Sequence, residues 1–515
     1  MTKRALISVY DKEGIVEFAQ ELQQKFNYEI VSTGGTFKAL KDAGLKVIET
    51  SELTGFTELL NGRVKTLHPS IHAGILADRT KQNDIKDLEN NNIDKIDMVV
   101  VNLYPFEDVA KNSKADIANI VENIDIGGVC LLRAAAKNYF SVTPVFCHQM
   151  YKSILTDLTE NNGETSYDLR KELAIDTFGY VSSYDLVIST ELRNRLTPQE
   201  DELPDRIGFN FRKKLDLRYG ENPQQKAALY DNNSGVSYEL LQGKELSYNN
   251  IVDMAAAIDI VKEFPDVPAV SIIKHKNPCG VALGADIETA YIEAFDCDPI
   301  SAFGGVIGSN RTVCKNMAKH MKDVFLEVVI APNFTDEALE ILKAKKNLRL
   351  VKICAEYMNF SKTSQLDVKL LPFGALVQTS DDREIDKDLF KVVTKAKPTT
   401  EQVEDMVFAW KICKHVSSNA IVVAKNLKAV GIGVGQTSRV ASMELALKQA
   451  CDMTKDAVIA SDGFFPAIDN IQAAAQSRIA AIIQPGGSIK DSEVIAECNK
   501  YKISMITTSI RHFKH

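Results

Sequence analysis

The residues Ser271-Ile272-Ile273-Lys274-His275-Lys276-Asn277-Pro278-Cys279-Gly280 give the clearest indication of how this chain folds. An apolar, β-branched run stops at a Lys-His pair and then enters a segment with proline and glycine. This pattern predicts a buried strand followed by a Pro/Gly loop. Open α/β sheets place their ligands at strand ends. The segment therefore predicts an α/β sheet that carries Lys274 and His275 to a ligand-binding edge.

Lys274 and His275 are candidate catalytic residues. An ammonium group beside an imidazole disfavours the imidazolium form, so we expect His275 to be neutral near pH 7 and able to act as a base. Lys274 could then supply a proton or positive charge to a leaving group. A solvated or purely structural pair at a strand end is the alternative, and this segment alone leaves it open.

The composition indicates a soluble globular protein with several domains. The chain has 515 residues, of which 45% are hydrophobic and 25% charged, and this length exceeds what one hydrophobic core supports. The formal net charge of -8 gives no general attraction to nucleic acid or to a membrane surface. Nine cysteines without close-set pairs suggest reduced thiols in a cytosol.

We expect no targeting segment among the N-terminal residues. Residues 5–9 (Ala-Leu-Ile-Ser-Val) form an apolar run of strand length that lacks the features of a signal peptide. No uninterrupted apolar stretch approaches the roughly 18–20 residues that cross a bilayer. We therefore expect a cytoplasmic protein.

The first two hundred residues alternate strand and helix patterns, which predicts a mostly parallel, doubly wound sheet. The expected strands cover residues 5–9, 29–31, 46–48 and 97–101. An acidic, proline-bearing linker follows near residues 195–206. We place the domain boundary there, giving domains 1–198 and 199–515.

The second domain repeats one pattern twice. One unit runs from residue 274 to 308 and another from 419 to 463, and each contains an apolar strand, a glycine-rich turn, a helix and another strand. This repetition predicts two similar α/β lobes that divide near residues 370–400.

The sequence Thr33-Gly34-Gly35-Thr36 is a candidate phosphate-binding turn. It lies where a strand pattern becomes a helix pattern, and two glycines let the backbone approach an anion at the helix N-terminus. No Gly-Lys-Ser/Thr follows, so it is not a Walker loop. A simple tight turn fits this pattern equally well.

Three further segments of the first domain carry chemically active side chains. Residues 62–69 bring two cations and an imidazole, residues 102–106 place Tyr104 at a strand end, and residues 125–137 start with Asp125. Each segment alone is more often structural than functional. Together they offer cation, phenol and carboxylate groups that a parallel sheet could gather at one edge.

The second domain offers two candidate anion-binding segments and no clear metal site. Arg218-Tyr219-Gly220-Glu221-Asn222-Pro223 could be a ligand-gripping loop or an exposed turn, and Arg439 follows a glycine-rich run. Pro278-Cys279 matches half of a zinc deaminase signature, but no His-x-Glu occurs upstream and no second cysteine follows at the required spacing. We therefore expect no catalytic zinc.

Several of these motifs, taken in order, resemble one known family, the bifunctional purine biosynthesis enzymes that join AICAR transformylase to IMP cyclohydrolase. The matching motifs lie at residues 62–69, 102–106, 125–137, 217–223, 274–280, 418–419, 435–439 and 461–466. The resemblance covers essentially the whole chain. It implies a methylglyoxal-synthase-like domain with the cyclohydrolase, followed by two cytidine-deaminase-like lobes with the transformylase.

The resemblance implies formyl transfer from 10-formyltetrahydrofolate to the amine of AICAR, then ring closure of formyl-AICAR to IMP. His275 would take the proton of the amine, Lys274 would favour departure of the folate nitrogen, and Asn419 would orient the carboxamide. The family pattern places nucleotide- and folate-side contacts at Arg218, Tyr219, Arg439, Glu327, Phe465, Asp469 and Arg511.

For the cyclohydrolase, the resemblance implies that Lys65 and Tyr104 stabilise the developing oxyanion and that Asp125 takes a proton, with help from Lys137. The expected binding residues are Lys12, Thr33, Gly34, Gly35, Thr36, Arg63, Asn102 and Gly127. Tyr10 stands where many relatives carry Ser, which bears on the phosphate contact near Lys12.

The resemblance also implies a homodimer with transformylase sites at the subunit interface. Some relatives hold a structural potassium ion through backbone carbonyls of the C-terminal region, which makes this ion a candidate here. The motifs leave two rival functions open. One is a nucleotide-binding sensor without turnover, and the other is an enzyme with a single activity.

Overall fold

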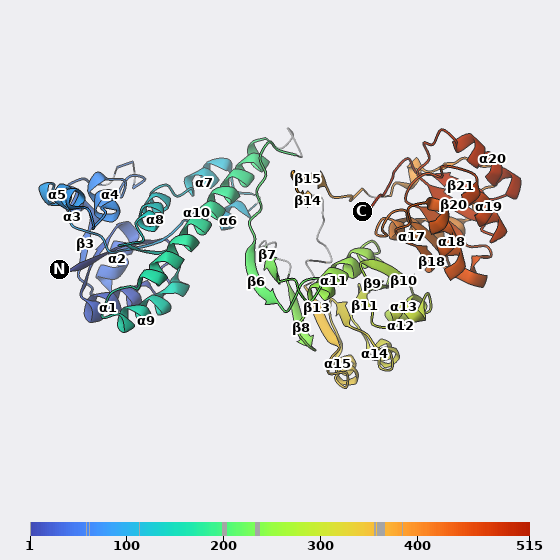
Figure 1. Cartoon of the computed structure of the whole chain (residues 1–515), viewed down its shortest axis with the longest axis horizontal. Coiled ribbons are helices and arrows are strands. Elements are labelled where there is room, and N and C mark those ends of the chain that lie inside the picture. The colour runs from blue at the N-terminus through green and yellow to red at the C-terminus, as the bar shows by residue number, and fades with distance from the viewer. Residues whose placement is uncertain are drawn as a thin grey trace. The chain divides into compact units, whose positions relative to one another are not determined.

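The computed structural model describes residues 2–57, 59–60, 62–112, 114–197, 203–231, 237–354, 357, 366–383 and 385–515. The chain divides into two compact units, Met1–Asn210 and Phe211–His515, which are described separately below (Figure 1). The boundary expected after residue 198 falls outside the described residues.

The first unit is built on a five-stranded parallel sheet with the order β3-β2-β1-β4-β5. Its strands are β1 (Lys3–Val9), β2 (Tyr28–Ser32), β3 (Val47–Glu49), β4 (Met98–Asn102) and β5 (Thr143–Val145). Its helices are α1 (Ile15–Phe26), α2 (Gly34–Asp42), α3 (Thr50–Thr54), α4 (Pro69–Leu76), α5 (Gln82–Asn90), α6 (Phe106–Ala110), α7 (Ile117–Glu122), α8 (Gly127–Lys137), α9 (Tyr151–Glu160) and α10 (Tyr167–Leu196). The parallel sheet expected from the alternating pattern is confirmed.

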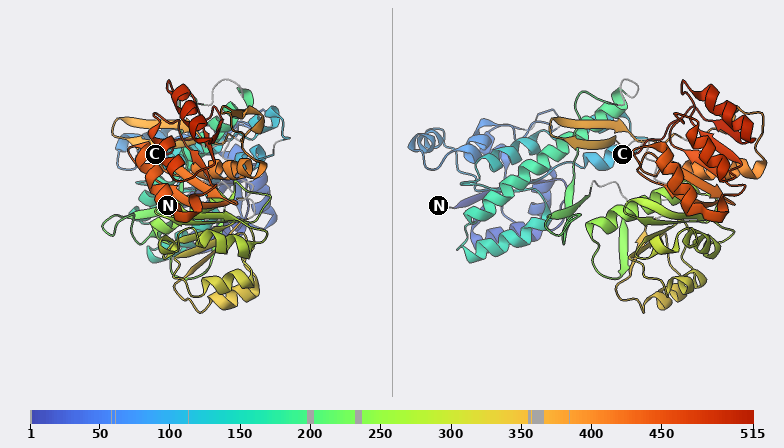
Figure 2. Two further views of the ribbon diagram at one scale, coloured as in Figure 1. Left: turned by 90° about the vertical axis from the view of Figure 1, so that its right-hand side faces the viewer. Right: turned by 45° about the vertical axis from the view of Figure 1, so that its right-hand side comes forward.

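Two hydrophobic clusters cover the two faces of this sheet. Residues from α1 and α9 pack with alternate residues of β1 and β4 on one face, and α4 and α8 pack on the other. Ser166 is the N-cap of helix α10, and its side chain accepts the backbone N–H of Leu169. At 30 residues it is about 45 Å long, and Figure 2 shows it running along the unit.

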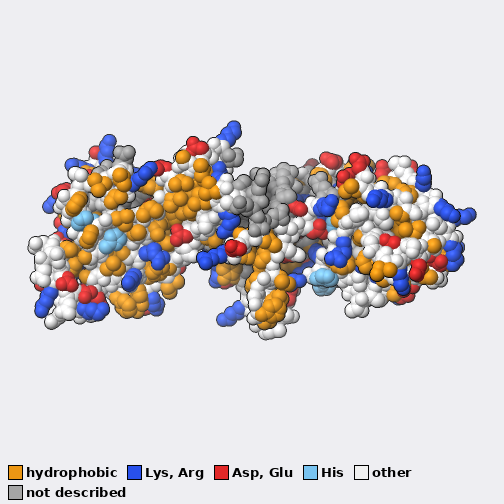
Figure 3. All heavy atoms as spheres, turned by 90° about the horizontal axis from the view of Figure 1, so that it is seen from above, with side chains coloured by type: hydrophobic (Ala, Val, Ile, Leu, Met, Phe, Trp, Pro, Cys, Tyr) orange, Lys and Arg blue, Asp and Glu red, His pale blue; other side chains and the backbone are white. Residues whose placement is uncertain are grey.

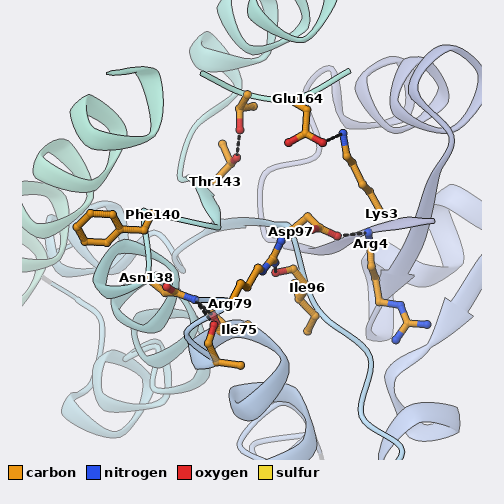
Figure 4. Close-up of polar contacts among 12 residues, drawn as sticks. Lys3, Arg4, Ile75, Arg79, Ile96, Asp97, Asn138, Phe140, Thr143 and Glu164 are labelled. Carbon is orange, nitrogen blue, oxygen red and sulfur yellow. Dashed lines mark hydrogen bonds and ion pairs between the residues drawn. The ribbon is translucent and has the colours of Figure 1, made fainter. Parts of the chain in front are cut away.

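Polar side chains form hydrogen bonds and ion pairs at the edge of this sheet where the strands begin (Figure 4). Asp97 accepts the backbone N–H of Arg4 at 2.7 Å and pairs with Arg79 at 2.7 Å. Lys3 pairs with Glu164 at 2.8 Å. Since the parallel strands all start at this edge, their carboxyl ends meet at the opposite edge, where ligands bind in such sheets.

The second unit contains a twelve-stranded sheet with the order β16-β21-β20-β19-β17-β18-β10-β9-β11-β12-β13-β8. Its strands are β8 (Tyr238–Gln242), β9 (Ala269–Lys274), β10 (Asn277–Leu283), β11 (Val306–Ser309), β12 (Val328–Ala331), β13 (Arg349–Ile353), β16 (Lys391–Val392), β17 (Ile421–Lys425), β18 (Lys428–Gly433), β19 (Val458–Ser461), β20 (Ala481–Gln484) and β21 (Ser504–Thr507). Its helices are α11 (Tyr248–Val261), α12 (Ile287–Phe295), α13 (Pro299–Ala302), α14 (Lys315–Met321), α15 (Asp336–Leu342), α17 (Thr400–Cys413), α18 (Arg439–Ala450), α19 (Asp469–Gln476) and α20 (Asp491–Tyr501). Two hairpins lie outside this sheet, β6 (Arg212–Leu217) with β7 (Ala227–Asp231) and β14 (Leu366–Leu371) with β15 (Gly374–Thr379).

The two halves of the large sheet repeat one topology. Strands β10-β9-β11-β12-β13 and β18-β17-β19-β20-β21 share their order and their pattern of antiparallel and parallel pairs. The halves join where Ala282 of β10 pairs with Lys428 of β18. A β-carbon on Gly280 would lie 2.0 Å from the Ala294 oxygen. The same contact recurs in the other lobe at 2.1 Å, between Gly431 and Ala446. This repeated close packing of strand and helix supports two similar lobes.

The structure corrects the loop expected after His275. Residues 278–280 are not in a loop but in strand β10, where all three are buried. Pro278 is tolerated there because the pairing with β9 is irregular between Pro278 and Gly280. A two-residue turn, His275 and Lys276, therefore connects the two strands. None of the helices in the described part of the chain is long and apolar enough to span a membrane.

Candidate functional site

The turn between β9 and β10 presents His275 to solvent. His275 and Lys276 both have positive φ angles, 56° and 68°. The backbone N–H of Lys276 donates to Asp253 Oδ1 at 2.7 Å. Beside the turn, Lys274 Nζ donates to the carbonyl oxygen of Phe303 at 3.0 Å. The imidazole and the ammonium group thus both lie at the edge of the sheet, as the sequence predicts.

The segment before β17 lies against this turn and carries Asn419. The side-chain oxygen of Asn277 accepts the backbone N–H of Ser417 at 2.9 Å. Asn277 belongs to the first lobe and Ser417 to the second. The junction of the lobes therefore brings the His275 turn and the Asn419 segment side by side.

Arg439 is buried and faces the interior of the second lobe. Its guanidinium forms an ion pair with the fully buried Asp462 and donates to Ser461 Oγ at 2.8 Å. A third bond runs from Nη2 to Asn419 Oδ1 at 2.8 Å. Asn419 Nδ2 in turn donates to the Gln436 oxygen at 2.8 Å. These bonds fix the orientation of the Asn419 side-chain amide, and Arg439 supplies one of them.

The loop after β6 reaches the same region. The Arg218 guanidinium lies 4.9 Å from the Tyr219 ring centroid. Two residues later, Glu221 Oε1 is 3.9 Å from Lys276 Nζ, and its carbonyl oxygen accepts from Asn249 Nδ2 at 3.3 Å. Arg218 is exposed. The structure therefore brings this expected binding loop next to the His275 turn.

Glu327 and Asp469 are placed at element ends. Glu327 comes just before β12 and its carboxylate pairs with Arg349 at 2.7 Å. Because β11 runs antiparallel to β9 and parallel to β12, Glu327 lies at the same sheet edge as Lys274. Asp469 is exposed at the first turn of α19, where Oδ1 accepts the backbone N–H of Asn470 at 2.8 Å.

The C-terminal tail lies along the Asn419 segment. Ser418 N donates to the Lys514 oxygen at 2.9 Å. The Arg511 guanidinium lies 4.3 Å from the Phe513 ring centroid, and the Arg439 guanidinium lies 6.0 Å from the same centroid. Arg511 is thus held near the buried arginine.

The ring of Phe465 has no exposed surface. It belongs to the hydrophobic core of the second lobe, whereas the neighbouring Phe464 is 40% exposed. Direct stacking of the Phe465 ring on a ligand therefore does not fit this structure, and Phe464 is the aromatic side chain that a ligand can reach.

In the first unit, two ammonium groups lie over the N-terminus of α2. A β-carbon built on Gly34 would lie 3.4 Å from Lys65 Nζ, and one on Gly35 would lie 3.9 Å from Lys12 Nζ. Thr33 is the N-cap of this helix. Helix N-terminal amides and two cations together favour an anion such as phosphate.

Thr36 and Asn102 hold the loops around this anion site. Thr36 Oγ1 donates to the Val9 oxygen at 2.9 Å and accepts the Val9 N–H at 3.1 Å. Asn102 Oδ1 accepts the backbone N–H groups of Tyr10 and Asp11 at 2.6 and 3.0 Å. Both expected binding residues thus hydrogen-bond to the backbone of residues 9–11 in this structure.

Lys65, Tyr104 and Asp125 form one electrostatic cluster. Burial raises the pKa of Asp125, against the lowering effects of backbone hydrogen bonds from Gly128 and Tyr104 and of the positive charge on Lys65. The Gly128 N–H lies 2.7 Å from Asp125 Oδ1. Burial also raises the pKa of Tyr104, and the charge of Asp125 adds to this. A buried carboxylate with a raised pKa is a better base than an exposed one.

Gly127 lets the Lys65 loop approach α8 closely. A β-carbon on Gly127 would lie 2.9 Å from Thr66 Oγ1, so any larger residue would push away the loop that carries Lys65. The glycine therefore supports the cluster without offering a side chain to a ligand.

Arg63 and Lys137 lie outside the Lys65 cluster. Arg63 pairs with Glu122, and both side chains are largely exposed. Lys137 is the last residue of α8, about 15 Å along the helix from Gly127. Within the described residues, no hydrogen bond or ion pair links Lys137 to Lys65, Tyr104 or Asp125.

One group of described side chains has the spacing of metal ligands: Asp11, Glu13 and His148. The distances instead indicate that the imidazole of His148 lies between the two carboxylates. His148 Nδ1 is 3.5 Å from Asp11 and Nε2 is 3.8 Å from Glu13, so the two carboxylates face opposite nitrogens of one imidazole. A single ion could take only one of these nitrogens.

Two family models together match most of the chain. A family model described as "AICARFT/IMPCHase bienzyme" matches residues 135–449, and one described as "MGS-like domain" matches residues 14–130. Proteins called "Bifunctional purine biosynthesis protein PurH" from Acetivibrio thermocellus and Rippkaea orientalis are each 48% identical to this chain, over the full length of both.

The chain belongs to the AICARFT/IMPCHase bienzyme family. A third relative of the same name, from a Thermoanaerobacter species, is 47% identical over all of both chains. A solved structure titled "Crystal structure of ForH" is 31% identical over 37% of this chain and all of its own, with a TM-score of 0.34. The matching family model and the full-length relatives confirm the family resemblance drawn from the sequence motifs.

The bienzyme site contains residues that sequence reasoning did not single out. Asp462, which neutralises Arg439, lies inside a motif at residues 461–466 that was matched only as a whole. Tyr184, on α10, accepts the backbone N–H of Asp125 at 2.9 Å through its hydroxyl oxygen. No local signal points to Tyr184, because it meets Asp125 only through the tertiary fold.

Proposed function

We propose that this member of the bienzyme family catalyses both reactions, one in each unit. The second unit transfers the formyl group of 10-formyltetrahydrofolate to the amine of AICAR, giving formyl-AICAR and tetrahydrofolate. The first unit closes formyl-AICAR to IMP with loss of water. The observation that carries this proposal is the presence of two separate clusters, Lys274–His275–Asn419 and Lys65–Tyr104–Asp125, each at the edge of its own sheet. We place the boundary between the two catalytic parts in the linker after residue 198.

In the formyl transfer, His275 accepts a proton from the AICAR amine as the amine attacks the formyl carbon. The amine is a poor nucleophile because its lone pair is delocalised into the ring, so this proton transfer matters. Lys274 stabilises the departing folate nitrogen, and Asn419 orients the carboxamide. General acid–base catalysis of this kind contributes about 10²–10⁴-fold. Correct orientation of the two substrates supplies much of the remainder.

Binding groups for this reaction lie around the same turn. Arg218, Tyr219 and Arg511 are the candidates on the nucleotide side, and Glu327 and Asp469 are those on the folate side. Arg439 acts mainly by fixing Asn419, since its guanidinium is buried and paired with Asp462.

In the ring closure, the carboxamide nitrogen attacks the formyl carbon within one molecule. Asp125 takes the proton of this nitrogen, which suits a carboxylate whose pKa is raised by burial. Lys65 and Tyr104 stabilise the oxyanion that develops on the formyl oxygen. Lys12 and the N-terminus of α2 hold the phosphate. The family resemblance also gives Lys137 an assisting role, although it lies at the far end of α8 from Gly127.

The family resemblance extends the proposal to a homodimer in the cytoplasm, with a structural potassium ion in the second unit. Figure 3 shows apolar side chains gathered on one face of the first unit. This unit exposes 62% of Phe140 and 66% of Ile175. Large exposed apolar patches mark interaction sites, and a second copy of the chain is the occupant that this proposal implies.

The proposal is tested by incubating the purified protein with AICAR and 10-formyltetrahydrofolate, and by following tetrahydrofolate, formyl-AICAR and IMP by chromatography. We expect one tetrahydrofolate for each IMP. Accumulation of formyl-AICAR would mean that the protein has only the formyltransferase activity. Binding of AICAR or IMP without any turnover would instead support the nucleotide-binding sensor.

A further inference from the structure

The turn that presents His275 has a backbone conformation that its residues do not favour. Lys274 and Asn277 pair across it, and the φ angles of the two central residues are 56° and 68°. Two-residue hairpin turns of this kind prefer asparagine and glycine at these positions. Two consecutive non-glycine residues keep such a conformation only where their surroundings hold it.

Asp253 on α11 holds this turn, and the second lobe repeats the arrangement. Asp253 accepts the Lys276 N–H at 2.7 Å. In the second lobe, the turn between β17 and β18 contains Asn426 and Leu427, with φ angles of 54° and 56°. Their N–H groups donate to Asp405 on α17 at 2.9 and 2.7 Å.

The two aspartates occupy matching positions in the duplicated lobes. Asp253 is the sixth residue of α11 and Asp405 is the sixth residue of α17. The molecule therefore contains one turn-holding arrangement twice, but only the first-lobe copy carries a histidine. Changes to the second-lobe copy therefore show what loss of such a turn does to the fold alone.

Asn277 adds a second restraint that the other lobe lacks. Its Nδ2 donates to the His275 carbonyl oxygen at 3.3 Å, and its Oδ1 accepts the Ser417 N–H at 2.9 Å. Ser417 is two residues before Asn419. The matching first residue of β18 is Lys428, whose ammonium instead pairs with Glu293 at 2.9 Å. One side-chain amide thus connects the backbone of His275 to the segment that carries Asn419.

We propose that Asp253 and Asn277 are positioning residues of the formyl transfer, which extends the function proposed above. Asp253 keeps the turn in the conformation that points His275 at the substrate amine. Asn277 sets the separation of His275 from Asn419, so that the base and the group that orients the carboxamide act on one bound AICAR. Neither residue contacts the substrate.

The test compares Asp253→Ala, Asn277→Ala and Asn277→Asp with the control Asp405→Ala, at a temperature where all four are folded. A misplacement of about 1 Å costs up to roughly a hundredfold in rate. We expect kcat for formyl transfer to fall about 10- to 100-fold in Asp253→Ala and Asn277→Ala, which remove the acceptors, with KM changed less than about threefold. Asn277→Asp keeps the acceptor for Ser417 and should retain more activity than Asn277→Ala. Asp405→Ala should keep the kcat of the unmodified protein.

Two outcomes would overturn the proposal. One is an equal loss of kcat in Asp405→Ala and Asp253→Ala, which would make the aspartates structural only. The other is an unchanged kcat in Asp253→Ala and Asn277→Ala. Conversion of supplied formyl-AICAR to IMP should stay the same in every variant. If the unmodified protein transfers no formyl group, the proposed function fails instead, and that result is separate from the variant comparison.

Discussion

The guanidinium of Arg439 donates through Nη2 to the side-chain oxygen of Asn419 at 2.8 Å. The same guanidinium is neutralised by Asp462, which has no exposed surface. Since Asn419 Nδ2 also donates to the Gln436 oxygen, one N–H of the amide is left for a substrate. Asn419 is thereby fixed as a donor toward a carbonyl oxygen, such as that of a carboxamide.

Replacing Arg439 by lysine should lower formyl transfer about 10²-fold. Lysine keeps the charge beside Asp462 but lacks the planar fork that reaches Asn419, Ser461 and Asp462 together. The rate of tetrahydrofolate release measures the loss, and conversion of supplied formyl-AICAR to IMP serves as the control. Unchanged formyl transfer in the lysine variant would show that Arg439 has no part in this reaction.

Gly34→Ala should weaken binding of formyl-AICAR to the cyclohydrolase. Gly34 has a φ of 47°, and its new β-carbon would lie 3.4 Å from Lys65 Nζ. We expect KM for formyl-AICAR to rise about tenfold, measured from initial rates of IMP formation. Gly35→Ala is the matched control, because Gly35 has no positive φ angle and its β-carbon would meet only the flexible end of Lys12 at 3.8 Å. Equal effects in both variants would argue against backbone strain at Gly34 as the cause.

The raised pKa of Asp125 predicts where cyclohydrolase activity is lost in acid. The base must be ionised, so its active form is present above its pKa and lost below it. Because burial raises this pKa above the ordinary 3.8, the acid limb of kcat/KM should lie above pH 3.8. Lys65 lowers the pKa of Asp125, so the limb should move to higher pH in the residual activity of Lys65→Gln. A limb that moves to lower pH would contradict this electrostatic link.

Asp97→Ala should destabilise the first unit without changing its chemistry. The carboxylate of Asp97 accepts from the backbone of Arg4 and from Arg79 at the sheet edge opposite the site. Leaving these donors without a partner costs about 1–3 kcal/mol in the free energy of unfolding, which urea unfolding measures. Asp94 also pairs with Arg4, but its side chain is 72% exposed, so Asp94→Ala should cost less than about 1 kcal/mol.

Local patterns in the sequence predicted much of this fold. The predicted strand at residues 5–9 lies in β1, and the one at 97–101 matches β4 (Met98–Asn102) to within one residue, because buried parallel strands need continuous apolar residues. The turn at His275 was not predicted, since it lacks the Asn-Gly signal and depends on Asp253, which lies on another element. The apolar-to-Pro/Gly transition indicated a loop, whereas Pro278 continues the hairpin as a strand.

The candidate site was predicted in part. Lys65, Tyr104 and Asp125 come together as expected because each follows or flanks an element at one sheet edge. The inward direction of Arg439 could not be seen in the sequence, since its partner Asp462 is 23 residues away. Lys137 is close to Asp125 in sequence, but the helix between them separates the two residues in space.

The most direct test of two independent sites uses Lys65→Ala and His275→Ala, with tetrahydrofolate, formyl-AICAR and IMP measured in each. We predict that Lys65→Ala releases tetrahydrofolate and accumulates formyl-AICAR. We predict that His275→Ala forms no formyl-AICAR from AICAR but still converts supplied formyl-AICAR to IMP. Equal loss of both steps in both folded variants would contradict the assignment of one reaction to each unit.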